Sequence, residues 1–188
     1  MKLYVKNMVC GRCKRVVREA LEGLGLRVEQ VELGEVTIAQ LPDNVAPDDI
    51  RRVLRANDFD LLDDRRTVLI EQIKTLIINE VHHGADKKPA HQNLSDFLAE
   101  RTGHDYAYLS HLFSSVEGLT IERYVIAQKI ERVKELLRYD ELSLSEIAWQ
   151  LGYSSVQHLS NQFKAVTGQP PGAFRKAQHP QRKPLDQV

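Results

Sequence analysis

Cysteine is scarce in this chain of 188 residues: Cys10 and Cys13 are the only two. Two cysteines so close together cannot staple a fold, and such usage is typical of a reducing compartment. Long apolar runs are missing as well, and no signal peptide is recognisable. We therefore expect a cytoplasmic protein with no membrane partner, whose core is held together by hydrophobic packing.

Net charge is also absent, because 26 Lys and Arg balance 26 Asp and Glu. Proteins that neutralise nucleic-acid phosphates usually carry a basic excess, yet residues 85–188 are almost balanced too. The length allows one large domain or two small ones. Any binding to nucleic acid must rest on the geometry of a motif and on local charge.

Residues 143–176 are the most informative stretch. Ser143 and Glu146 stand at the spacing of a capping box, which predicts a helix start, and Gly152 predicts a tight turn. A second helix fits before Gly168 and two prolines, with a predicted buried side formed by Val156, Leu159, Phe163 and Val166. Two helices joined by a short turn predict a helix-turn-helix that reads DNA, although a helical hairpin in an all-α core has the same pattern.

The same stretch resembles the second helix-turn-helix of the AraC/XylS family of transcription regulators. The matching positions are Glu146, Ile147, Ala148, Gly152, Tyr153, Ser154, Phe163, Lys164, Gly168 and Pro171. The resemblance implies a regulator that binds double-stranded operator DNA and is not an enzyme, with RNA polymerase as a further candidate partner.

A repeat runs through the C-terminal half. Leu98, Ala99, Gly103, Leu109, Ser110, Phe113, Val116 and Gly118 recur, at a nearly constant offset, as Ile147, Ala148, Gly152, Leu159, Ser160, Phe163, Val166 and Gly168. Such a repeat indicates two copies of one unit. We predict a DNA-binding domain over 85–188, with one helix-turn-helix at about 93–118, a linker helix at 120–139 and a second helix-turn-helix at 143–168.

Each predicted reading helix has a face turned away from the core. In the second unit this face carries Gln157, Ser160, Asn161 and Lys164, with Ser155 at the helix start. Asn and Gln can bond adenine bidentately, and Lys suits guanine or phosphate. The matching positions of the first unit lack Lys and Arg: Tyr106, Ala107, Ser110, His111 and Ser114. We predict that the second unit carries most of the sequence discrimination; a solvated polar face is the alternative for both.

The first 64 residues read as a separate unit. A short strand at 2–8 and a helix from Gly11 to Gly25 come first. Alternating residues on either side of Gly34 predict a hairpin, and a helix beginning at Pro47 precedes a last strand at 59–62. The order βαββαβ is that of ferredoxin-like domains. The predicted fold class is therefore α+β: a ferredoxin-like domain followed by an all-α domain with two helix-turn-helix units.

Residues 8–13, M-V-C-G-R-C, resemble the M-x-C-x-x-C of heavy-metal-associated domains. Two thiolates at a helix N-terminus are stabilised by its amides and dipole, and soft thiolates favour Cu(I) or a similar soft ion. The expected metal ligands are Cys10 and Cys13, in a ligand loop that includes Met8, Arg12, Lys14 and Arg15; the resemblance adds Phe59. A thiol redox switch, or a small anion held by the three cations, remains open.

A helix at 65–84 joins the two parts. Its apolar residues cover more than half of its circumference, so it needs two neighbours, and a second copy of the chain is a candidate for one of them. His82 and His83 follow as a solvated helix end or as metal ligands. The overall hypothesis is a one-component regulator controlled by a small effector at its N-terminal domain. More remote alternatives are a metal chaperone and a thiol-disulfide oxidoreductase.

Overall fold

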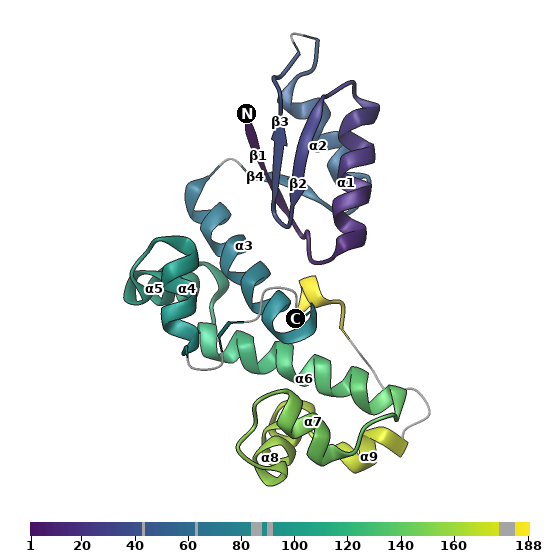
Figure 1. Cartoon of the computed structure of the whole chain (residues 1–188), viewed down its shortest axis with the longest axis vertical. Helices are drawn as coiled ribbons and strands as arrows, with labels where there is room; N and C mark the ends of the chain where they lie inside the picture. The colour runs from purple at the N-terminus through teal and green to yellow at the C-terminus, as the bar shows by residue number, and fades with distance from the viewer. Residues whose placement is uncertain (43, 63, 84–87, 90–91, 177–182) are drawn as a thin grey trace. The chain divides into compact units, whose positions relative to one another are not determined.

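The computed structural model describes residues 1–42, 44–62, 64–83, 88–89, 92–176 and 183–188 (Figure 1). The chain forms two compact units, an N-terminal unit, Met1–Val116, and a C-terminal unit, Glu117–Val188. The division falls within the last residues of the first predicted helix-turn-helix, at about 93–118. The predicted boundary at 84/85 lies outside the described residues.

The chain begins with the predicted βαββαβ order. Its elements are β1 (Lys2–Lys6), α1 (Gly11–Gly23), β2 (Val28–Glu32), β3 (Glu35–Ile38), α2 (Pro47–Arg55) and β4 (Asp60–Leu62). The strands form one sheet in the order β2-β3-β1-β4, and every neighbouring pair is antiparallel. Gly34, with φ of +82°, makes the turn between β2 and β3 where a side chain would be strained.

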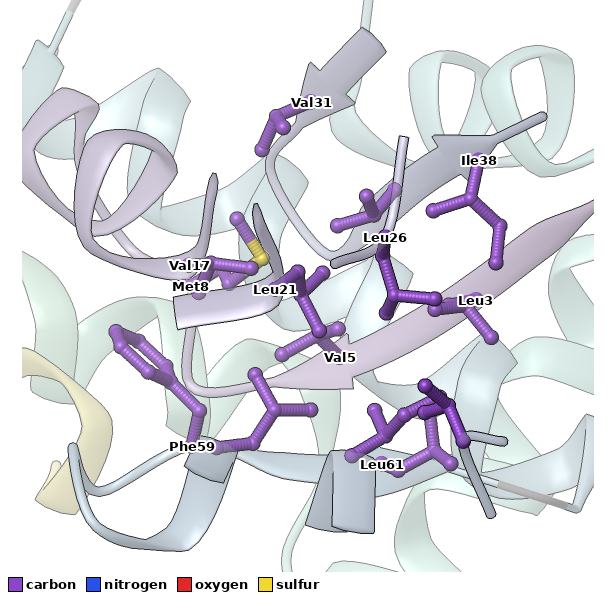
Figure 2. Packing of buried hydrophobic residues seen from close by; sticks show 14 residues of the cluster. Leu3, Val5, Met8, Val17, Leu21, Leu26, Val31, Ile38, Phe59 and Leu61 are labelled. Atoms are coloured by element: carbon purple, nitrogen blue, oxygen red, sulfur yellow. The ribbon is translucent and has the colours of Figure 1, made fainter. Parts of the chain in front are cut away.

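Helices α1 and α2 cover one face of this sheet (Figure 1). Alternation along β1 sends Leu3 and Val5 to that face, where Val17 and Leu21 of α1 are fully buried. Figure 2 shows Met8 beside Val17 at the end of this core. The remaining β1 side chains, including Tyr4, point to the opposite face.

The opposite face of the sheet is contacted by α3 (Arg65–Ile78), which begins at Asp64, whose carboxylate accepts from the Thr67 amide. A π-helical turn, η1 (Asn79–His83), continues it. Helix α3 also contacts α4 (Leu94–Thr102). The wide apolar band of the connecting helix therefore has two neighbours within the chain itself.

The first helix-turn-helix consists of α4 and α5 (Tyr106–Glu117). Asn93 caps α4 by accepting from the Asp96 amide, and Gly103 ends it in the left-handed conformation with φ of +70°. Asp105 accepts from the Ala107 amide at the start of α5. Local hydrogen bonds thus define this unit, at bounds close to those predicted.

The C-terminal unit is built around α6 (Ile121–Tyr139), which α7 (Leu144–Gln150), α8 (Val156–Thr167) and α9 (Pro171–Lys176) all contact (Figure 1). The predicted capping box is present, because Ser143 and Glu146 bond each other's backbone amides. A short 3-10 helix, η2 (Leu185–Gln187), follows. Lys183 and Leu185 reach back to α6, where the Lys183 amide donates to Glu131 and Gln128 donates to the Leu185 carbonyl.

One predicted burial is wrong. Leu159 and Phe163 are fully buried, and Phe163 packs edge-on against Phe174 with ring centroids 5.4 Å apart. Val166, predicted on the same buried side, is 51% exposed, and its counterpart Val116 is 52% exposed. Both lie in the last turn of their helices, α5 and α8, beyond the positions of Phe113 and Phe163 that are fully buried.

Within the described ranges, no helix is both long enough and apolar enough to cross a membrane.

The difference between Phe163 and Val166 predicts a difference in stability. Phe163→Ala removes a fully buried ring and should lower the free energy of unfolding by about 3–5 kcal/mol. Val166→Ala is the matched control on the same helix, and should change it by no more than about 0.5 kcal/mol. Urea unfolding followed by circular dichroism measures both; similar losses for the two variants would contradict the packing described here.

Candidate DNA interface and cysteine site

The second helix-turn-helix places α8 with its polar side open to solvent. Ser155 caps the helix by accepting from the His158 amide at 3.1 Å. Gln157, Asn161 and Lys164 are exposed, Ser160 is half-buried, and Gln157 donates to the Asn161 side chain at 2.8 Å. The side-chain amides of Gln157 and Asn161 lie one turn apart on one face of α8. They stand in the N-terminal half of the helix, the half that meets base edges in a docked helix-turn-helix.

The turn before α8 is held by Tyr153. Burial raises the pKa of Tyr153 to about 12, so the phenol is neutral, and it donates to the Gln162 side chain at 2.8 Å. The Lys129 ammonium of α6 lies 5.3 Å from the centre of the Tyr153 ring. These contacts fix the entry of α8 relative to α6 and so orient the reading face within the C-terminal unit.

Sequence reasoning missed His158. Its side chain is exposed in the first turn of α8, and its Nδ1 lies 3.1 Å from the Ser154 hydroxyl. The edge of the Tyr153 ring also contacts it, with centroids 5.4 Å apart. Its place directly after Gln157, near the helix start, was the available signal, because residues at that end of a reading helix contact bases.

The first reading helix, α5, presents a different surface. Ala107 and His111 are exposed, while Tyr106, Ser110 and Ser114 are half-buried. The helix contains neither lysine nor arginine. Its surface therefore offers hydrogen-bonding and apolar groups but no fixed cation.

The cysteines lie at the start of α1, with Cys10 as the residue that precedes the helix. Their sulfur atoms are 3.2 Å apart and share a hydrogen bond. Both side chains are partly exposed. A hydrogen bond holds the residues before the cysteines in place: the Asn7 side chain donates to the Asp58 carbonyl at 3.0 Å. The backbones of Asn7 and Asp58 both adopt the left-handed conformation.

The two thiols differ in acidity. Partial burial acts to raise the pKa of Cys10, but hydrogen bonds from the Cys13 amide, the Cys13 thiol and the Arg12 amide outweigh it, so this pKa lies below its ordinary value. Burial raises the pKa of Cys13, and its hydrogen bond to Cys10 adds to the effect. Cys10 is therefore the more acidic thiol of the pair and the first to form a thiolate as the pH rises.

The other predicted loop residues are distributed over three environments. Met8 and Phe59 belong to the hydrophobic core, at 1% and 8% exposure, and support the loop from its inner side (Figure 2). Lys14 is paired with Glu32 of β2. Arg12 and Arg15 are exposed. The cationic loop expected from sequence thus has one of its three charges directed at a carboxylate.

His83 reaches the cysteine loop from the far end of η1. Its Nε2 lies 2.8 Å from the carbonyl oxygen of Val9, the residue before Cys10. Sequence reasoning treated His83 as a solvated end or a metal ligand, and this hydrogen bond is neither. Within the described residues, no group of three or more Cys, His, Asp or Glu side chains is arranged to hold a metal ion, so the donor set at the loop is the two sulfurs.

Residues 98–177 match the sequence model of the helix-turn-helix domain family. This match begins within α4 and covers the remainder of the first helix-turn-helix and all of the second. The relatives below include HTH-type transcriptional regulators, to which the chain is similar.

Two uncharacterised HTH-type transcriptional regulators of Bacillus subtilis are similar to the chain. YtdP is 24% identical over 177 residues, which are 92% of this chain and 22% of YtdP. YfiF is 38% identical over 68 residues, which are 36% of this chain and 21% of YfiF. The chain therefore spans about a fifth of the length of these relatives.

Among solved structures, the C-terminal domain of AraT, a response regulator from Geobacillus stearothermophilus, has a similar fold. It superposes with a TM-score of 0.51 at 22% sequence identity, covering 60% of this chain and 88% of that domain.

The asymmetry of the thiols is testable by alkylation. In the reduced protein, iodoacetamide should modify Cys10 before Cys13 as the pH is raised, because the thiolate is the nucleophile. Cys13→Ala removes the thiol donor and should move the Cys10 profile to higher pH. Mass spectrometry of digested samples measures both profiles, and earlier modification of Cys13 would contradict the assignment.

Proposed function

We propose that this protein is a one-component transcription regulator that binds specific operator DNA through its two helix-turn-helix units, under the control of a soft metal ion held by Cys10 and Cys13. The DNA-binding part rests on the solvent-exposed polar face of α8, a helix that is capped at its start and buried on its opposite side. The segment also matches a family of helix-turn-helix domains.

Helix α8 is the main source of specificity in this proposal. Gln157 and Asn161 are already bonded to each other, which restricts their rotamers before DNA is met and lowers the entropy lost on binding. An amide side chain of this kind can bond adenine bidentately. Lys164, one turn further along, suits a backbone phosphate.

The N-terminal domain is proposed to be ferredoxin-like and similar to heavy-metal-associated modules. The strand order β2-β3-β1-β4 with two helices on one face supports this. Among the described residues, no third Cys, His, Asp or Glu donor groups with the two sulfurs. Two sulfurs alone suit a monovalent soft ion such as Cu(I), because structural zinc takes four ligands. Metal binding requires both thiolates, so the proton shared by the sulfurs is released.

The link to DNA binding is proposed to run through α3 and η1. His83 holds the backbone directly before Cys10, and Gly34 of the β2–β3 turn abuts Thr75 of α3, with 3.9 Å between the Thr75 hydroxyl and an added Cβ. Helix α3 packs on α4 of the first helix-turn-helix. A change in the loop can reach the DNA-binding part only if the ligand favours one arrangement of these contacts.

Thiol oxidation is the second candidate control. The sulfurs are 3.2 Å apart, so a small loop movement would close a disulfide, whose bond length is about 2.05 Å. The lowered pKa of Cys10 favours this chemistry as well. A small anion at the loop is less favoured, because Lys14 is bonded to Glu32.

Base recognition by α8 predicts separate roles for its residues. Asn161→Ala should weaken binding to a DNA site selected from a random pool by about 1–3 kcal/mol and relax preference at one base pair. Lys164→Gln is the matched comparison: it should weaken binding to selected and unrelated DNA alike and reduce the salt slope by about one. Fluorescence anisotropy at several salt concentrations measures both. Full affinity and selectivity in Asn161→Ala would overturn the assignment.

Control by metal predicts that Cu(I) binding and the response of DNA affinity to Cu(I) can be separated by mutation. Cu(I) titrated against a chelator should bind the reduced protein and change its affinity for the selected DNA, and Cys10→Ser/Cys13→Ser should abolish both effects. His83→Ala should keep Cu(I) binding while DNA affinity no longer responds. A large loss of Cu(I) affinity in His83→Ala would instead make His83 a ligand. A DNA response to oxidised glutathione, and none to Cu(I), would favour the redox alternative.

A further inference from the structure

The N-terminal unit contains a cavity of about 750 Å³ whose lining includes no residue of the cysteine loop. Tyr4 and Leu62, which face each other across β1 and β4, form one wall. Arg65 and Arg66 at the start of α3 form a second, and His104 and Tyr108 beside α5 a third. This volume is in the range of small-molecule sites.

The charge at the cavity is unusual for its position. Arg65 and Arg66 are the first two residues of α3, where the helix dipole disfavours positive charge. The Asp64 carboxylate, which precedes them, offsets part of this unfavourable charge. Desolvation acts to raise the pKa of Asp64, but hydrogen bonds from the Arg66 and Thr67 amides outweigh it and lower that pKa overall. Among the ion pairs between described residues, none joins Arg65 to a carboxylate. Two guanidinium groups at one rim suit an anion.

Most of the remaining lining is aromatic or aliphatic, with Gln72 of α3 as a further polar residue. The rings of His104 and Tyr108 lie 5.5 Å apart, and Tyr108 is 47% exposed although it is a large side chain. Leu69 adds an aliphatic surface on α3. A ligand that fits both halves of this lining has a planar apolar body and a negative group. A DNA backbone would use the arginines but would leave the concave apolar walls without a partner.

We propose that this cavity is a second effector site, which binds a small aromatic carboxylate with its carboxylate on Arg65 and Arg66 and its ring against Tyr4 and Tyr108. The site goes beyond the function proposed above, because it needs neither cysteine. It touches the sheet, α3 and the first reading helix, so an occupant contacts the elements that join the N-terminal domain to the first helix-turn-helix.

Benzoate is the probe for this class. The full, reduced chain, labelled with ¹⁵N and without DNA or metal, is titrated while its amide signals are followed by NMR. Benzoate should give saturable shifts around β1, β4 and the start of α3. Benzyl alcohol should bind roughly tenfold or more weakly, because it lacks the charge-assisted hydrogen bonds. Phenyl phosphate and inorganic phosphate are parallel arms; tighter binding of inorganic phosphate than of benzoate would overturn the aromatic carboxylate assignment.

Variants locate the site. Arg65→Gln/Arg66→Gln should weaken benzoate roughly tenfold or more, and Tyr108→Ala should weaken it without removing the charge. Arg52→Gln, an exposed arginine on α2, should change nothing, and neither should Cys10→Ser/Cys13→Ser. Dispersed spectra of each variant verify folding.

Shifts centred on Arg12 and Arg15 would overturn the proposal by placing the anion at the cysteine loop. The absence of saturable shifts in the wild type would overturn it as well, and a parallel loss of DNA affinity in Arg65→Gln/Arg66→Gln would assign those arginines to DNA phosphates. The benzoate titration itself uses neither DNA nor Cu(I), so its failure is distinct from failure of the proposed regulator function.

Discussion

The apolar surface of α3 has to be covered on two sides, and the arrangement of the N-terminal unit follows from this constraint. Ile70, Ile73 and Ile77 are buried almost completely, between the open face of the sheet and α4. Each such side chain contributes roughly 1.5–3 kcal/mol when buried. The sheet and the first helix-turn-helix therefore share one hydrophobic element, and α3 cannot shift against one of them without disturbing its packing on the other.

The cysteine loop is attached to that element by polar contacts. Asn7, before the cysteines, is bonded to Asp58 of the α2–β4 connection. Val9, next to Cys10, is bonded to His83 at the end of η1. Hydrogen bonds between partly exposed groups are individually weak, so the loop can exchange them at small cost. The hydrophobic contact thus provides a stable frame, and in the proposed regulator the polar contacts are the part that a ligand would alter. Such a division suits a sensor, because coupling energies of about 1–3 kcal/mol are enough to change site occupancy severalfold.

Sequence predicted the elements well where the signals are local. The capping box of Ser143 and Glu146, the left-handed Gly168 and the period of apolar residues all act within a few residues, and they set the observed helix ends. The exposure of Val166, the Lys14–Glu32 pair and the His83–Val9 hydrogen bond depend on residues brought together by tertiary packing. The cavity at Arg65 is of the same kind, since its walls come from three distant segments. No pattern of neighbouring residues in the sequence predicts any of these features.

The neutral charge of the chain bears on how such a regulator would work. Helix α5 has no lysine or arginine, and Arg175 of α9 is directed at Asp140 and the Leu142 carbonyl. Residues 85–188 also carry nearly equal numbers of basic and acidic side chains, so in the proposed regulator the sequence-independent part of DNA binding is expected to be small. Affinity depends on base contacts, which require an accurate helix position. In the proposed regulator, a displacement of a reading helix too small to matter for a strongly basic protein would therefore be enough to change binding.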